Sequence, residues 1–376
     1  MKLPTTNIKD TTSSLLQGAG AAIKVIRSLA GLNELRPVWD SASSAEWASP
    51  MLHHDWVRIC AEVFDLGGVF DIVVVGSPPS LAIAPLFRSR RSGERLELIG
   101  VGELYEVSDF LYSDGSNIDA LAAALAESRL PVLLGRILAD SPILAALRNA
   151  YRRRGFVMCR PATGYPWISL DKSWESPEQH LNAGRRSDLR RARRIAEGIG
   201  PLSFDILSPD PAHLESLLRE AYEVEAAGWK AREGSALAHD ALRGEFYRRY
   251  AAAACKQGIL RLCFLRIGGR LAAMQLAAVS GDRFWLLKIG YADEFARCSP
   301  GMLLMLETIR YAAQCGLRSY EFLGADEPWL RVWTELVRPC VSLRAYPINL
   351  RGGMVLARDG MIAIRAKVNS VLRGKP

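Results

Sequence analysis

The 376-residue sequence lacks the patterns that mark metal centres and disulfide frameworks. Its seven cysteines are dispersed, form no C-x-x-C pair and mostly lie in apolar runs, which favours reduced, buried thiols and a cytoplasmic location. Its five histidines have no ligand spacing to cysteines or carboxylates, so we expect no metal cofactor. The one cluster, His53-His54-Asp55, is expected to begin a helix, because adjacent residues of one element point apart.

The N-terminal residues 1–35 lack the pattern of a secretory signal. Their apolar part, Leu15–Leu32, is interrupted by Gln17, Lys24 and Arg27, whereas a signal carries its charge ahead of an unbroken apolar core. The same part is too short and too charged for a transmembrane helix. We expect a flexible arm or a weak amphipathic helix there.

What the sequence does contain is enough apolar residues for two cores. Hydrophobic residues make up 49% of the chain and charged residues 23%, as in soluble globular proteins, and the length suffices for two domains. The formal net charge of +8 favours anionic partners, among them nucleotide cofactors, acidic glycans, tRNA and membrane surfaces. The charge does not choose among these.

The first module is expected over residues 36–170, where helical and strand-like segments alternate as in a mixed α/β fold. The expected strands are 70–75, 81–87, 96–99 and 132–137, and the expected helices are 45–64, 120–127 and 142–154. Gly100-Val101-Gly102 lacks the third glycine of a dinucleotide-binding fingerprint and is expected to be a loop. No group of residues in this module points to catalysis.

A junction rich in proline and glycine, residues 160–177, leads into the second module, residues 171–350. Early in this module, residues 185–194 form a basic helix. The residues of that helix expected to be buried are Leu189, Ala192 and Ile195. Its arginines are interpreted either as a phosphate-binding patch for RNA or acidic glycan or as a solvated helix face. The second interpretation is favoured, because charge runs usually serve solubility.

The centre of the second module reads as a hairpin followed by two further strands. Leu260–Ile267 and Leu271–Val279 flank Gly268-Gly269, a dipeptide suited to a two-residue hairpin turn. Further strands are expected at Arg283–Ile289 and Tyr320–Leu323.

Between those two strands, Ser299-Pro300-Gly301 precedes a helical pattern over Met302–Cys315 that ends at Gly316. Ser299 is expected to cap the helix with its side chain, and Pro300 to occupy its first turn. Gly301 lets another group approach the backbone. Free amides at such a start, aided by the helix dipole, bind phosphate and other anions. Spacing alone favours a helix start without a ligand and leaves the function open.

Several of these motifs, in this order, resemble the acetyltransferase domain of the cellulose-biosynthesis (CelD/BioF2-like) branch of the GNAT superfamily. The residues that carry the resemblance are the hairpin, Lys288 and Tyr291, Ser299-Pro300-Gly301, Gly316, Phe322-Leu323-Gly324 and Trp329…Trp333. The resemblance covers about Asp188 to Trp333, and a weaker one covers about Val38 to Leu170. It implies, as in the related Fem-type peptidyltransferases, two tandem GNAT-like modules, each a mixed central sheet flanked by helices.

The resemblance further implies that the second module binds acetyl-CoA or another acyl-CoA between adjacent strands, with the pyrophosphate at the helix start. The residues implied for this donor site are Arg297, Ser299, Pro300, Gly301 and Met302. The loop Gly228–Ala236 matches the Gly-Trp-Lys stretch of the family, although it reads equally well as a loop anchored by a buried tryptophan. The residues implied for substrate binding are Trp229, Lys230, Arg232 and Trp329.

The catalytic candidates are Lys288, Tyr291, Asp326 and Glu327. If Lys288 faces inward, its amine can interact with the donor or acceptor; the alternative is that Lys288 lies at an edge position exposed to water and has no role in the site. Tyr291 is either the proton donor to the leaving thiolate or a packing aromatic, and Asp326 or Glu327 accepts the proton of the amine. Leu330 stands where related domains often carry a lysine, which argues against a mechanism that depends on that lysine.

We therefore expect an acyl-CoA-dependent N-acyltransferase, first of all an N-acetyltransferase, acting on an amine-bearing small molecule or glycan precursor. The acceptor implied is an amino sugar or an envelope or exopolysaccharide precursor. A Fem-like transferase using aminoacyl-tRNA and a non-catalytic GNAT-fold scaffold in polysaccharide synthesis stay open. The basic extension, residues 351–376, is expected to close the second module with a strand and helix rather than anchor to anionic lipid, so no stable membrane insertion is expected. The oligomeric state does not follow.

Overall fold

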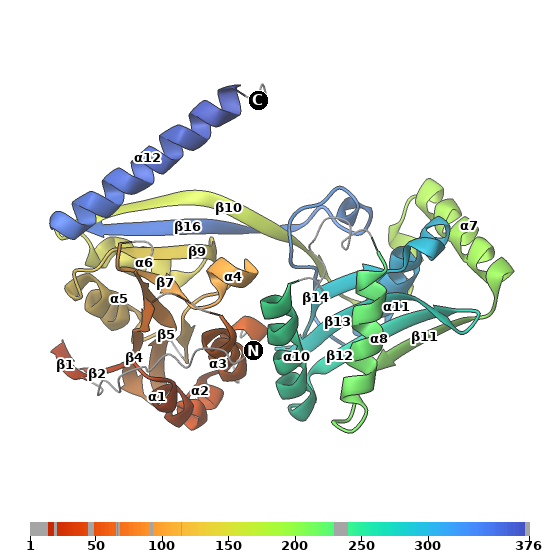
Figure 1. Ribbon diagram of the computed structural model, residues 1–376, viewed down its shortest axis with the longest axis horizontal. Helices are drawn as coiled ribbons and strands as arrows, with labels where there is room; N and C mark the ends of the chain where they lie inside the picture. Colours follow the sequence, from red (N-terminus) through yellow and green to blue (C-terminus); the bar gives the residue numbers. More distant parts are fainter. Residues whose placement is uncertain are drawn as a thin grey trace, which may run out of the picture. The chain divides into compact units, whose positions relative to one another are not determined.

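The computed structural model describes residues 14–18, 21–43, 49–64, 66, 68–90, 93–113, 115–228 and 240–372 (Figure 1). The chain divides into two compact units. Unit 1 comprises Met1–Ala45, Met51–Ala162 and Pro339–Pro376, and unit 2 comprises Glu46–Pro50 and Thr163–Arg338. The C-terminal part of the chain thus returns to unit 1, whereas the sequence analysis assigns it to the second module.

Unit 1 contains a five-stranded antiparallel sheet, in the order β1-β2-β4-β5-β8, and a mixed sheet in which β10, β16, β9, β7, β6 and β3 follow one another. The strands are β1 (Ser14–Gly18), β2 (Ala21–Ile26), β3 (Gly68–Phe70), β4 (Ile72–Ser77), β5 (Ser80–Ala84), β6 (Leu86–Ser89), β7 (Arg95–Leu98), β8 (Leu111–Tyr112), β9 (Val132–Leu138), β10 (Gly155–Ser169) and β16 (Val337–Pro347). The helices are α1 (Leu29–Glu34), α2 (Arg36–Ser43), α3 (His54–Val63), α4 (Val101–Leu104), α5 (Ile118–Glu127), α6 (Pro142–Ala150) and α12 (Leu350–Leu372).

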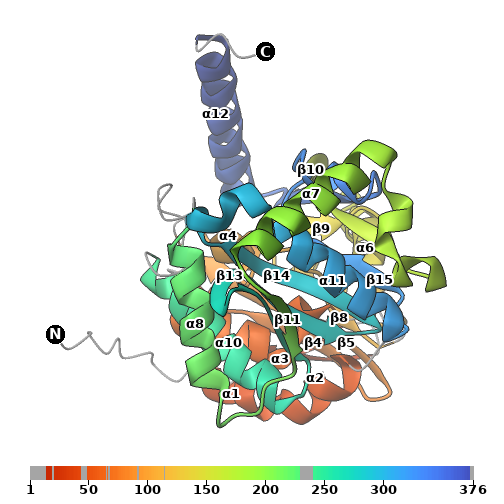
Figure 2. The ribbon, with the colours of Figure 1, turned by 90° about the vertical axis from the view of Figure 1, so that its right-hand side faces the viewer.

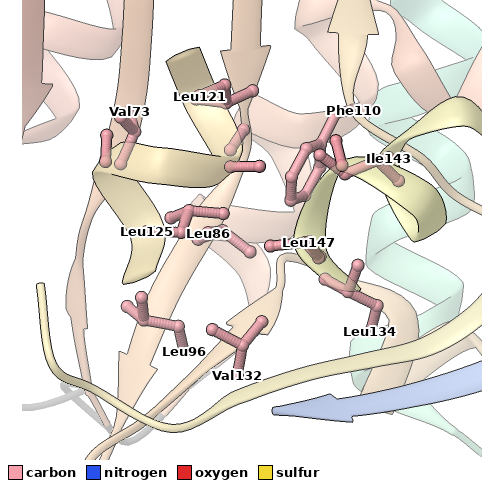
Figure 3. Packing of buried hydrophobic residues seen from close by; sticks show 14 of the residues in the cluster. Val73, Leu86, Leu96, Phe110, Leu121, Leu125, Val132, Leu134, Ile143 and Leu147 are labelled. Atoms are coloured by element: carbon pink, nitrogen blue, oxygen red, sulfur yellow. The ribbon is translucent and has the colours of Figure 1, made fainter. Parts of the chain in front are cut away.

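Unit 1 has a hydrophobic core of its own. Figure 3 shows Leu121 and Leu125 of α5 and Ile143 and Leu147 of α6 gathered with side chains from the strands. The strand residues labelled there are Val73, Leu86, Leu96, Val132 and Leu134, all of which are buried. Side chains of this size each stabilise a fold by about 1.5–3 kcal/mol when fully buried. This cluster fits the expectation of separate cores.

Three local predictions in unit 1 differ from the structure. Ser14–Gly18 and Ala21–Ile26 pair as the antiparallel strands β1 and β2, where a flexible arm or helix was expected. Val101–Leu104 form the short helix α4, preceded by Gly100 with a φ of 82°, where a loop was expected. The boundary between the units, at Ala162 and Thr163, falls inside the expected junction 160–177, but β10 continues across it to Ser169. Pro161 and Pro166 have extended backbone, which a strand accepts wherever no ladder amide is needed.

Unit 2 is built on strands in the order β11-β12-β13-β14-β15-β10. Apart from the end of β10, these are β11 (Leu202–Leu207), β12 (Leu260–Ile267), β13 (Arg270–Ser280), β14 (Arg283–Tyr291) and β15 (Ser319–Glu321). Its helices are α7 (Ala183–Ile199), α8 (Leu214–Ala226), α10 (Ala241–Lys256) and α11 (Pro300–Gln314), with short 3-10 helices η2 (Lys172–Glu175), η3 (Pro177–His180), η4 (Asp293–Cys298) and η5 (Leu330–Val332). β14 and β15 are parallel, and the other pairs are antiparallel.

The predicted hairpin at the centre of unit 2 is confirmed. Ile267 pairs with Arg270, and the two turn residues, Gly268 and Gly269, have φ values of 57° and 76°. Positive φ at both turn positions is the geometry for which glycine is favoured. The same dipeptide therefore fixes the register of β12 and β13.

Helices cover both faces of the unit 2 sheet. α7 and α11 share one cluster with Cys263 and Leu265 of β12, and Figure 2 shows α11 lying across β13 and β14. α8 and α10 cover the other face, on which Lys288 lies over the ring of Tyr247. Within α7, Ala192 is buried as predicted, but Ile195 is 36% exposed.

Candidate active site

The site is set by a fork between β14 and β15. The two strands pair only where Arg283, Phe284 and Trp285 face Ser319, Tyr320 and Glu321. Beyond Trp285, β14 continues to Tyr291 with β13 as its ladder partner. Beyond Trp285, no described strand pairs with the other edge of β14, and an extended ligand could lie along that edge.

A bulge shapes the part of β14 beyond Trp285, where β15 no longer pairs with it. The register with β13 shifts between Leu276 and Ala277, so that Leu287 is an extra residue on β14. Such a bulge bends the strand and changes which way its side chains point. Here it precedes Ile289, Gly290 and Tyr291, which line the pocket described next.

An apolar pocket of 350 Å³ lies between the end of β14 and the first turn of α11. We call it the apolar pocket. Its walls are Met274, Gln275, Ile289, Gly290, Tyr291, Ala296, Ser299, Pro300, Gly301, Met302, Met305 and Trp329. Six of the residues proposed from the sequence therefore meet in one cavity, since Tyr291 and Trp329 line it together with Ser299–Met302.

A second pocket of 460 Å³ adjoins the first at the start of α11. We call it the basic pocket. It is lined by Arg185, Asp188, Leu189, Arg191, Ala192, Ile195, Arg297, Ser299, Met302 and Val332. Ser299 and Met302 belong to both pockets, so one elongated ligand can occupy the two together.

The basic pocket carries an excess of positive charge. Arg185 lies 3.9 Å from Asp188. No described residue forms an ion pair with Arg191 or Arg297, and both are exposed. Of the arginine-rich helix, Arg185 and Arg191 thus face a cavity rather than bulk solvent alone, which favours the phosphate-binding interpretation for these two positions.

The start of α11 differs in detail from the prediction. Pro300 occupies the first turn as expected, but the side chain of Ser299 makes no capping hydrogen bond, because its backbone is left-handed with a φ of 44°. Its carbonyl instead accepts the amides of Met302 and Leu303 at 3.0 and 3.2 Å. The amide of Gly301 has no partner among the described residues, so it is the donor left for a ligand.

Glycine at position 301 is not required by the fold. Gly301 has no positive φ, and a Cβ added there would meet only Cδ1 of Tyr291, at 3.9 Å. Because glycine inside a helix is less favourable than alanine by about 1 kcal/mol, its presence has a cost with no packing reason. Close approach of a ligand to the backbone supplies a reason.

Tyr291 lines the apolar pocket, whereas the nearby Cys298 lines neither pocket. Tyr291 is half-buried in the wall of the apolar pocket, and its hydroxyl has no hydrogen-bond partner among the described residues. Burial raises the pKa of the Cys298 thiol, although the charge of Arg297 lowers it, so this cysteine stays protonated. The hydroxyl of Tyr291 therefore faces the site without a described partner, whereas the raised pKa of Cys298 disfavours its thiolate form.

Several predicted residues lie away from both pockets. Lys288 is half-buried with its Nζ 4.6 Å from the centroid of the Tyr247 ring. Asp326 is exposed and pairs with Arg331 at 3.0 Å, and Glu327 is exposed. Trp229, Lys230 and Arg232 lie outside the described residues.

Two polar residues near the site were missed by the sequence analysis. Gln275 is 1% exposed, and its side chain lies between Met305 Sδ, 3.6 Å from Nε2, and the Tyr320 hydroxyl, 3.4 Å from Oε1. It is the sole polar residue of the strand-like run Leu271–Val279, which was the available signal. Glu225 is 2% exposed and continues the apolar spacing of α8, another visible anomaly.

Glu225 is held close to the C-terminal end of β14, at Gly290. A Cβ added at Gly290 would lie 2.9 Å from Glu225 Cα and 3.3 Å from its Cγ. Likewise, a Cβ at Gly228 would lie 2.4 Å from the Tyr291 carbonyl oxygen. Only glycine at these two positions allows the end of α8 to approach the strand that lines the apolar pocket.

Comparisons with known proteins agree with this geometry. Residues 183–331 match the family model of the acetyltransferase (GNAT) domain. The structure of FemX is similar at 13% identity and a TM-score of 0.55, over 83% of this chain and 96% of that chain. No curated protein matches the sequence.

Two further solved structures are similar. One is the C-terminal (DUF2156) domain of a protein from Agrobacterium fabrum assigned as a lysylphosphatidylglycerol synthetase, at 11% identity and a TM-score of 0.53, over 89% of this chain and 97% of that chain. The other is a conserved protein of unknown function from Bacteroides thetaiotaomicron VPI-5482, at 10% identity and a TM-score of 0.52, over 85% of this chain and 97% of that chain. At such identities the likeness establishes the fold alone.

The chain therefore has the GNAT fold, and the predicted fold class of mixed α/β modules is confirmed. In the part of the chain that the structure describes, no helix combines the length and apolarity of a membrane span. Nor does any group of three histidine, cysteine, aspartate or glutamate side chains among the described residues have the geometry to hold a metal ion.

Proposed function

We propose that this protein is an acyl-CoA-dependent N-acyltransferase with its donor site in unit 2. The observation that carries the proposal is the continuity of the apolar and basic pockets at the start of α11. Coenzyme A combines a long arm containing two amides with a cluster of phosphates. The edge of β14 beyond Trp285, where β15 no longer pairs, suits the arm, and the amide of Gly301 with Arg191 and Arg297 suits the phosphates.

The reaction proposed is direct transfer. The amine nitrogen attacks the thioester carbonyl carbon, the carbon–sulfur bond breaks, and the amine loses a proton to a base. Tyr291 lines the pocket and protonates the departing thiolate of coenzyme A. For the base, Asp326 and Glu327 remain candidates, although neither lines a pocket. Asp326 pairs with Arg331, whereas Glu327 has no ion pair among the described residues.

The acceptor proposed is an amine on an amino sugar or on an envelope or exopolysaccharide precursor, with acetyl-CoA as the first donor to test. This assignment follows the resemblance to the CelD/BioF2-like branch. Trp329 is 39% exposed in the wall of the apolar pocket and offers a stacking surface for a sugar ring. We also propose that Trp229, Lys230 and Arg232 bind the acceptor.

Calorimetric titration with acetyl-CoA tests the donor site. We expect micromolar binding that weakens about tenfold in Arg191→Ala and in Arg297→Ala, because each loses one charge-assisted contact worth about 1.5 kcal/mol. Arg190→Ala is the matched control, since Arg190 is the neighbouring exposed arginine of α7 and lines neither pocket. If wild-type protein does not bind acetyl-CoA, weight moves to the tRNA-dependent and scaffold hypotheses.

The second candidate function is aminoacyl transfer from tRNA, and the exposed arginines of α7 favour it. Arg190, Arg191 and Arg194 are all exposed, and none forms an ion pair with a described residue. A tRNA backbone would engage all three, so Arg190→Ala and Arg191→Ala should weaken tRNA binding alike in gel shifts, with a strong dependence on salt. Absence of any shift at low salt would count against this candidate.

A further inference from the structure

α12 has one face on unit 1 and another that no described residue covers. On the docked face, Val355 is 3% exposed and Asp359 is 8% exposed. Asp359 pairs with Arg95 and Arg344 at 3.2 and 3.0 Å and accepts a hydrogen bond from the Tyr346 hydroxyl at 2.7 Å. These contacts fix the N-terminal half of the helix and its rotation about its own axis.

The opposite face carries a continuous apolar stripe. Its described members follow one another at intervals of 4, 3, 4, 3 and 4 residues: Leu350, Met354, Ala357, Met361, Ile364 and Val368. All six are exposed, and Leu350, Ile364 and Met354 are 80%, 64% and 58% exposed. Residues at such intervals lie along one line of a helix. The stripe is therefore a continuous apolar surface, and two further exposed apolar residues, Leu356 and Ile362, lie outside it.

The second half of the helix has little support from unit 1. After Asp359, no described side chain of α12 is buried, and Figure 1 shows the helix leaving the rest of unit 1. An isolated helix of about 12 residues is marginal in water, and Gly360 weakens it further. A surface that covers the stripe would supply the missing stabilisation.

The charges beside the stripe show which surface fits. Arg351, Arg358 and Arg365 recur every seven residues along one flank, and Lys367 lies on the other. Arg351 pairs with Glu94 at 2.7 Å, so Arg358, Arg365 and Lys367 carry most of the positive charge offered to a partner. Asp359 is the one acidic residue between Leu350 and Leu372, and it belongs to the docked face. The outer part of α12 is thus apolar with a basic border and no acidic side chain.

A second copy of this chain would not complement these charges. Two antiparallel copies of α12 would place arginine beside arginine, and two parallel copies would place arginine beside glycine and lysine. Neither arrangement brings a carboxylate of α12 to these arginines. An anionic lipid surface takes the apolar stripe below its headgroups and the arginines at its phosphates. We propose that α12 is a peripheral docking helix for an anionic membrane surface, lying in its plane without crossing it.

The test is flotation of the full-length protein with vesicles of phosphatidylcholine containing phosphatidylglycerol, and with vesicles of phosphatidylcholine alone. We expect binding to the anionic vesicles, decreasing with salt, and an at least tenfold lower partition coefficient for Ile364→Glu. Ile362→Glu is the matched control, because Ile362 is 54% exposed on the same helix but off the stripe, and we expect less than a threefold change. Equal melting curves of the two variants establish that both fold.

Three results would overturn the proposal. One is equal partition of wild-type protein on anionic and neutral vesicles, and another is equal loss in the two isoleucine variants. The third is a dimer in sedimentation velocity that Ile364→Glu dissociates, without vesicle binding by the wild type, since the stripe would then be a seam between two copies. None of these depends on acyl-CoA binding, so the proposal stands or falls apart from the proposed enzymatic function.

Discussion

Replacing Gly301 with tryptophan is expected to abolish acetyl-CoA binding, with at least a hundredfold rise in Kd, and to leave the fold intact. The indole would project from the first turn of α11 into a pocket of 350 Å³, where it competes with the donor for the same space. Folding should survive, because the position has no positive φ and a Cβ there meets only Tyr291, at 3.9 Å. Calorimetric titration measures the Kd, an activity assay measures turnover, and a melting curve tests the fold.

The matched control for this substitution is Gln314→Trp, which adds the same side chain to the exposed far end of α11 and should leave the Kd unchanged. Gly301→Ala sharpens the comparison. It should raise the free energy of unfolding by about 0.5–1 kcal/mol, through helix propensity, while weakening donor binding. Unchanged binding in Gly301→Trp would overturn the assignment of the pyrophosphate to the start of α11.

The central strands of unit 2 were predictable because their signals are local. A Gly-Gly dipeptide between two apolar runs specifies a hairpin, and the structure places both glycines at positive φ. Pro300 and Gly316 likewise mark the ends of α11. The path of β10 was not predictable in the same way. Its prolines are typical of a junction, and only the neighbouring strands show that they belong to a continuous strand.

The donor side of the site was predicted better than the catalytic side for a similar reason. Ser299 to Met302 are consecutive, so their placement at one pocket follows from one helix start. The prediction for Lys288 depends on which face of β14 its side chain occupies. The extra residue Leu287 changes the alternation of faces along β14, and the sequence of one strand does not reveal such a bulge. Gln275 and Glu225 are visible in the sequence as polar residues within apolar patterns, but their proximity to the site follows only once α11 and α8 are packed on the sheet.

The fork itself rests on a buried carboxylate, Glu321, the last residue of β15. It is 0% exposed, and it accepts two hydrogen bonds from Arg338 at 2.7 and 2.6 Å and one from Ser319 at 2.7 Å. Arg338 in turn lies 3.9 Å from the ring of Trp167 on β10. Glu321 is also opposite Trp285, the last residue at which β14 and β15 pair. The network therefore holds the strands together at the point where they separate.

Glu321→Ala should cost about 3–5 kcal/mol, because it leaves Arg338 partly buried without its carboxylate. Hydrogen–deuterium exchange of peptides from β14 and β15 measures the loss within unit 2, where a global melt would mix the two units. Asp326→Ala removes an exposed pair with Arg331 and should cause little change, since solvent screens such pairs. If the two variants exchange alike, the fork does not depend on Glu321. If only Glu321→Ala loses protection, acetyl-CoA binding should also weaken, because β14 beyond Trp285 would no longer be held in place.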